Sequence, residues 1–143
     1  MVRFHPDPPI MSQKGETFFT RVGCMDGRVQ EPVATFGRKK FGGQYPDTII
    51  EAGLVGLLAK ETVDRNLLTS LKKKISISLE KHHSKGIVVY GHQDCAGNPV
   101  DDEKHKQDTK VAAQVISSFV PQDVRIAPVF VKRENDTWIV EEL

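Results

Sequence analysis

The sequence predicts an α/β protein, a single-domain doubly wound sheet that is mostly parallel and has helices on both faces. Short apolar runs rich in β-formers alternate with longer segments in which apolar residues recur at helical spacing. Glycine and proline stand between these segments, where a chain that packs helices on a sheet has to turn. Right-handed crossovers then favour the strand order 2-1-3-4, with a possible fifth strand at one edge.

Five segments have the composition of strands. The third, Ile87–Tyr90, reads Ile-Val-Val-Tyr, a continuous apolar run typical of a strand buried on both faces. The others contain the β-branched and aromatic residues that favour extended structure. They are expected at 17–23, 45–52, 124–131 and 138–140.

Three segments have the pattern of helices. The first runs from Pro32, whose missing N–H costs nothing in a first helical turn, to about Lys40, before two glycines. The second begins at Asn66 and shows leucine and isoleucine at helical spacing, and the third covers 101–119. Segment 53–64 is interpreted as a turn that continues into a loop.

A chain of 143 residues fits one compact domain, which we expect over residues 16–143. Residues 1–15 are rich in proline and polar side chains and are expected to form an N-terminal arm. A formal net charge of +1 provides no overall basic field for nucleic acid. No apolar run approaches the roughly twenty residues that cross a bilayer, and no signal peptide is recognisable, so we expect a cytoplasmic protein without membrane partners.

Three candidate metal ligands follow predicted strands. Cys24 comes directly after the first strand, and His92 and Cys95 follow the third. The winding of the predicted sheet reverses between these two strands, so a crevice opens where their carboxyl ends meet. Two thiolates and one imidazole are good ligands for Zn²⁺, and three protein ligands leave the fourth position open, as in catalytic zinc sites. Such a site makes hydroxide from bound water at neutral pH.

Other interpretations of these residues stay open. The two cysteines could form one disulfide, although a chain without a secretion signal favours free thiols. They could also be two buried thiols beside a core histidine. A nucleophilic Cys24 is disfavoured, because phosphatase-type loops have a longer anion cradle between cysteine and arginine.

Asp26 and Arg28 follow Cys24 on the same turn. Arg28 can keep Asp26 ionised through a bidentate pair. Asp26 could then orient a zinc-bound hydroxide by accepting its hydrogen bond, or it could swing in as the fourth zinc ligand. A structural ion pair that only braces the turn is the third interpretation.

Several further polar and aromatic residues receive weaker predictions. Asp94 is expected to support the metal ligands or to cap the amides of the following turn. His82 and His83 end the second predicted helix and are expected to be exposed rather than to relay protons. His105 has no assigned role, and Trp138 is expected in the core or a subunit interface.

The two motifs resemble those of the β-class carbonic anhydrases. Cys24–Arg28 matches the pattern Cys-x-Asp-x-Arg, and Gly91–Cys95 matches a strand-ending Gly-His-x-Asp-Cys. The residues around both motifs also resemble those of a small branch of carbonic anhydrases. The resemblance covers about 17–131. It implies that the two cysteines and the histidine bind zinc, and that the Asp–Arg pair is catalytic.

The resemblance also implies a function, the zinc-dependent reversible hydration of carbon dioxide to bicarbonate, in a homodimer or higher homo-oligomer. Two departures from the family pattern keep alternatives open. Ala96 stands where glycine is usual, and Leu54 stands where asparagine is usual. Both departures touch the expected substrate pocket. One alternative is therefore hydrolysis of carbonyl sulfide or carbon disulfide on the same zinc, and another is a non-catalytic zinc-binding or bicarbonate-sensing module.

Overall fold

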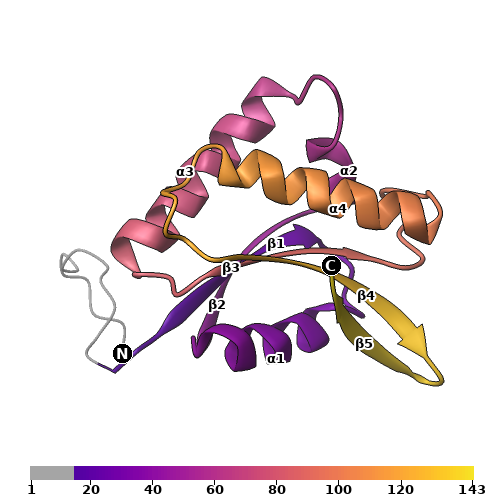
Figure 1. Cartoon of the computed structure of the whole chain (residues 1–143), viewed down its shortest axis with the longest axis horizontal. Helices are drawn as coiled ribbons and strands as arrows, with labels where there is room; N and C mark the ends of the chain where they lie inside the picture. The colour runs from indigo at the N-terminus through magenta and orange to yellow at the C-terminus, as the bar shows by residue number, and fades with distance from the viewer. Residues whose placement is uncertain (1–14) are drawn as a thin grey trace, which may run out of the picture.

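The computed structural model describes residues 15–143, and most of the predicted arm lies outside the described residues. These residues form a five-stranded sheet in the order β2-β1-β3-β4-β5, in which only β5 runs antiparallel to its neighbour (Figure 1). The predicted fold class and strand order are confirmed. In chain order the elements are β1 (Phe18–Cys24), α1 (Gln30–Phe41), β2 (Tyr45–Glu51), α2 (Leu54–Leu58), α3 (Arg65–Lys81), β3 (Ile87–His92), α4 (Asp102–Ser117), β4 (Ile126–Glu134) and β5 (Thr137–Glu142).

The sheet separates two apolar clusters. Helices α2, α3 and α4 cover one face, and α1 covers the other (Figure 1). The alternation along β3 shows the division, because Ile87 and Val89 pack with the first cluster while Val88 and Tyr90 pack with the second. Every residue of β3 is buried, as expected for the central strand of a sheet covered on both faces. Within the described residues, no helix combines the length and hydropathy needed to cross a bilayer.

The short helix α2 is the main difference from the sequence prediction, which placed a turn and a loop there. Leu54, Val55 and Leu58 are buried in the core, so this segment packs as a single helical turn under tertiary contacts. Gly53 and Gly56 obscured the helical spacing, because paired glycines indicate a turn when a sequence is read alone.

The carboxyl-terminal hairpin is longer than expected. Strand β4 ends at Glu134 instead of 131, and it begins at Ile126 instead of 124. Pairing with β5 extends both strands, and this pairing depends on a two-residue turn in which Asn135 adopts a positive φ of 57°. Asparagine and aspartate tolerate this conformation, so the Asn135-Asp136 pair is the feature of the sequence that indicates a hairpin turn here.

A partly buried polar cluster ties β1, β2 and α3 together at the amino ends of the strands. Asp47 Oδ2 accepts hydrogen bonds from Ser78 Oγ and His82 Nδ1, both at 2.7 Å. Ser78 in turn contacts Thr20 Oγ1 at 2.7 Å. His82 also stacks on Phe18, with ring centroids 4.0 Å apart, and is half-buried. The prediction that His82 is exposed is therefore wrong, because β2 brings the carboxylate of Asp47, which is distant in sequence, against it.

Candidate metal centre

The carboxyl ends of the two central strands bring the three predicted metal ligands together. Cys24 is the last residue of β1, His92 is the last residue of the adjacent strand β3, and Cys95 lies on the loop after it. All three side chains are buried, and their potential ligand atoms lie within 4.8 Å of one another. Among the described residues this is the only cluster of this kind, and it lies at the carboxyl edge of the sheet, as the topology predicted.

The geometry of this cluster fits a tetrahedral metal. The Sγ atoms of Cys24 and Cys95 are 3.7 Å apart, which is too far for a disulfide, and both cysteines are free. Two sulfurs on one tetrahedral zinc, each at about 2.3 Å, would be about 3.8 Å apart. His92 Nδ1 contacts the carbonyl oxygen of Gln93 at 2.8 Å, so its N–H points there, and the buried Nε2 has no hydrogen-bond partner. An imidazole nitrogen left unpaired beside two sulfurs is the arrangement that a metal ion satisfies.

The two thiols have different environments. Burial raises the pKa of Cys24, but the neighbouring His92 and the backbone N–H of Gly53, 3.4 Å from Sγ, outweigh burial and lower it. Burial and the charge of Cys24 raise the pKa of Cys95 above its ordinary value. Without metal, the cluster therefore favours a single thiolate, at Cys24. Binding of a divalent metal would also deprotonate Cys95 and release its proton.

Two loops meet closely behind Cys24. Gly53 adopts a positive φ of 65°, and a Cβ atom at this position would lie 2.3 Å from the backbone of Gly97. Gly97 is equally constrained, because its Cβ would lie 2.5 Å from the Gly53 nitrogen. The close approach aims the Gly53 N–H at the sulfur, so glycine is required here for both conformation and space.

Buried side chains fix the turn that carries Cys24. Tyr90 donates its hydroxyl hydrogen to the carbonyl oxygen of Cys24 at 3.0 Å, and burial raises the pKa of this tyrosine to about 12. Gln30 Nε2 donates to the same oxygen at 2.9 Å and to the carbonyl oxygen of Asp26 at 2.8 Å. Sequence reasoning missed both residues, since neither belongs to a metal-ligand pattern.

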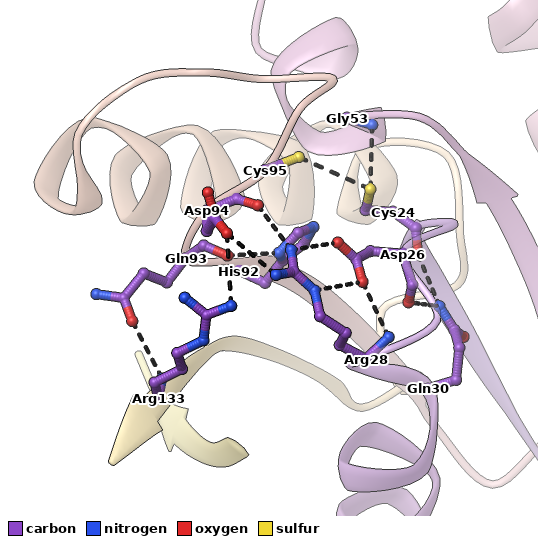
Figure 2. Close-up of polar contacts among 10 residues, drawn as sticks. All are labelled: Cys24, Asp26, Arg28, Gln30, Gly53, His92, Gln93, Asp94, Cys95 and Arg133. Atoms are coloured by element: carbon purple, nitrogen blue, oxygen red, sulfur yellow. Dashed lines mark hydrogen bonds and ion pairs between the residues drawn. The ribbon is translucent and has the colours of Figure 1, made fainter. Parts of the chain in front are cut away.

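Asp26 and Arg28 form the predicted bidentate pair beside the metal cluster (Figure 2). Arg28 Nε donates to Asp26 Oδ1 at 3.0 Å, and Nη2 donates to Oδ2 at 2.7 Å. The hydrogen bonds from Arg28 lower the pKa of Asp26 to about 2, so this carboxylate is ionised at neutral pH. Among the described residues, Asp26 is not part of the metal-ligand cluster.

Asp94 contacts arginines and not the turn that follows it. Its Oδ2 accepts a hydrogen bond from Arg28 Nη1 at 3.0 Å, and its carbonyl oxygen accepts one from Arg28 Nη2 at 2.9 Å. The backbone is left-handed, with a φ of 58°, and this conformation directs both groups toward Arg28. Of the two predicted roles, support of the neighbouring site fits these contacts, whereas no contact to the turn amides supports capping.

His105 is a second buried histidine beside the cluster. Its ring centroid lies 5.9 Å from that of His92, and its Nε2 atom is buried without a hydrogen-bond partner. The pKa of His105 is lowered to about 4, mainly by burial and to a smaller extent by the charge of His92. This histidine is therefore neutral in the folded protein at neutral pH.

The pKa of His105 predicts acid sensitivity of the metal-free protein. As pH falls from 6.5 to about 4, the unfolded chain takes up a proton at this residue and the folded chain does not. Stability from this group is complete above pH 6.5 and decreases below it, by about 3 kcal/mol in total. Urea unfolding across this range should show a flatter pH dependence for His105→Gln. Parallel curves for the two proteins would contradict the prediction.

A buried pair of cysteines and one histidine at the carboxyl edge of a parallel sheet, next to an ionised Asp–Arg pair, defines an α/β protein with a candidate metal centre. Residues 14–143 match the family described as “Putative carbonic anhydrase”, and the chain belongs to this family. A search of curated proteins finds no significant match.

Two solved structures share this fold. The carbonic anhydrase from Streptococcus mutans is 18% identical, with a TM-score of 0.54 over 86% of this chain and 80% of the other. The β-carbonic anhydrase isoform I from Trichomonas vaginalis is 14% identical, with a TM-score of 0.51 over 94% of this chain and 87% of the other. At these identities the similarity establishes the fold alone. The predicted resemblance to the family is confirmed by the family match over residues 14–143.

Proposed function

We propose that this protein is a zinc lyase that reversibly hydrates carbon dioxide to bicarbonate, with Cys24, His92 and Cys95 as the metal ligands. The observation that carries the proposal is the buried three-ligand cluster beside an ionised Asp26. No fourth histidine, cysteine or carboxylate joins this cluster among the described residues, so the fourth position remains for water or substrate. Family membership supports the same reaction class.

The side chains have distinct roles in this proposal. When bound, Zn²⁺ supplies a Lewis acid that lowers the pKa of water to about 7 in favourable sites. Asp26, ionised by its pairing with Arg28, would accept a hydrogen bond from the attacking hydroxide and so orient the hydroxide's lone pair toward carbon. Arg28 keeps this carboxylate from turning away or taking up the proton. Gly53 and Tyr90 hold Cys24 in place through its sulfur and its carbonyl oxygen.

The test is stopped-flow hydration of carbon dioxide by the zinc-loaded protein over a pH series. We expect zinc-dependent turnover that rises with pH as the water ionises, without an inflection from Asp26 near its ordinary pKa. Arg28→Gln should lower turnover by about 10- to 100-fold while retaining zinc, since loss of an outer partner that supports a metal site typically has an effect of this size.

Two outcomes would redirect the assignment. Sulfide release from carbonyl sulfide or carbon disulfide, without carbon dioxide turnover, would identify the hydrolase. Bound zinc with no turnover of any of these substrates would identify a binding or sensing module. A homodimer is proposed on the family resemblance alone, and sedimentation equilibrium would test it.

A further inference from the structure

Arg28 is held from a second side by Asp94 of the second motif and by Trp138, which lies outside both motifs. Besides its bonds to Asp26, it donates to the carboxylate and the carbonyl oxygen of Asp94. Its guanidinium group also lies over the ring of Trp138 on β5, with Cζ 4.9 Å from the ring centroid. This cation–π contact adds to the hydrogen bonds that the guanidinium N–H groups make to Asp26 and Asp94.

Arg133 on β4 completes this arrangement. Its Nη2 lies 3.6 Å from Asp94 Oδ2, and its Cζ lies 4.7 Å from the Trp138 ring centroid. Arg133 and Trp138 are direct partners in the antiparallel register of the hairpin. The backbone N–H of Arg133 also donates to Gln93 Oε1 at 3.1 Å, which joins the hairpin to the loop after β3 (Figure 2).

We propose that Arg133 and Trp138 are positioning residues, which hold Arg28 against Asp26 and thereby keep Asp26 away from the metal. The inference rests on the roles proposed above for Asp26 and Arg28. Asp26 lies two residues from Cys24, and its carboxylate is itself a competent zinc ligand once Arg28 releases it. The hairpin therefore biases the site toward its open form, with the fourth position free.

The first test needs no metal. In the metal-free protein, the Arg28 Nε–H group should give a protected side-chain resonance in ¹⁵N NMR, because it donates to Asp26. Its assignment follows from its loss in Arg28→Lys. We expect exchange to broaden this resonance in Trp138→Leu and in Arg133→Gln, and Trp138→Phe should retain it. An unchanged resonance in both Trp138→Leu and Arg133→Gln would overturn the proposal.

Arg125→Gln is the matched control. Arg125 is an exposed arginine with a similar contact, 4.8 Å from the ring centroid of Phe41, and it lies on the loop before β4, away from the metal cluster. The Arg28 resonance should be unchanged in this variant. Loss of the resonance in Arg125→Gln as well would indicate a general effect of removing arginine and would count against the inference.

The second test reads metal coordination with Co²⁺ as the probe. Trp138→Leu should shift the visible ligand-field bands of the Co²⁺-loaded protein, because Asp26 joins the metal. The double variant Trp138→Leu/Asp26→Asn should show the bands of Asp26→Asn alone. A shift that persists without the Asp26 carboxylate would mean that the tryptophan acts only on general packing.

The two proposals fail in different ways. Neither measurement uses carbon dioxide, so an inactive native protein would remove the proposed reaction and leave the positioning role standing. The native protein could instead be active, with an Arg28 resonance and a Co²⁺ spectrum that do not change in Trp138→Leu or Arg133→Gln. That result would remove the positioning role alone.

Discussion

Replacing Cys24 with serine is expected to abolish stoichiometric zinc binding and, with it, turnover. The substitution removes one of two sulfur donors from a three-residue cluster, and serine supplies a weaker, protonated oxygen in its place. Loss of a residue that only supports a metal ligand weakens affinity by about 10- to 100-fold, so loss of a ligand should exceed about 100-fold. Competition with a chromophoric chelator measures the affinity, and elemental analysis after dialysis measures the stoichiometry.

The control for this variant is His105→Gln. It alters another buried polar residue close to His92 but leaves all three proposed ligands in place. We expect this protein to keep one zinc per chain at neutral pH. If Cys24→Ser bound zinc as tightly as the native protein, the cluster of Cys24, His92 and Cys95 would not be the metal site.

Gly53→Ala is expected to be among the most destabilising single substitutions in this protein. The new Cβ would meet the Gly97 backbone at 2.3 Å, and the residue would have to keep a positive φ of 65°. The left-handed backbone alone costs about 1–2 kcal/mol for a residue with a Cβ. Separation of the two loops adds to this, so we expect a total above about 3 kcal/mol. Urea unfolding of the metal-free protein measures this loss.

Gly42→Ala separates the two contributions. Gly42 ends α1 with a similar φ of 77°, but a Cβ there has no atom within 4 Å. This variant should therefore lose only the conformational part, about 1–2 kcal/mol. Equal losses in the two variants would show that the approach of Gly53 to Gly97 is easily relieved. Gly53→Ala should in addition weaken zinc binding, because the Gly53 N–H bonds to the Cys24 sulfur.

The predictable part of the site depended on the strands. Cys24 and His92 each end a strand, and the reversal of winding between β1 and β3 brings such ends together in any sheet of this topology. The bidentate bond between Asp26 and Arg28 was predictable for a similar reason, since both residues lie on one turn. These contacts are short-range in sequence or are set by strand order.

The unpredicted part depended on contacts between distant segments. Trp138 packs beside the second apolar cluster as expected for a core residue, but its ring also covers Arg28, which lies at the other end of the chain. His82 is half-buried because β2 brings Asp47 against it. Helix α2 forms because Leu54 and its neighbours are buried in the first apolar cluster. No local pattern contains the partner in any of these cases.

The sequence by itself therefore determined the α/β sheet, its strand order, the three candidate ligands and the Asp26–Arg28 pair. Alternating hydrophobic periodicity sets the elements, and strand order sets which ends meet. Only the tertiary structure decided how Asp26 is restrained, because the arginine beside it is held by Asp94 and by the β4–β5 hairpin. Those contacts join residues far apart in the chain, and their distances depend on the register and turn of a hairpin that composition does not specify.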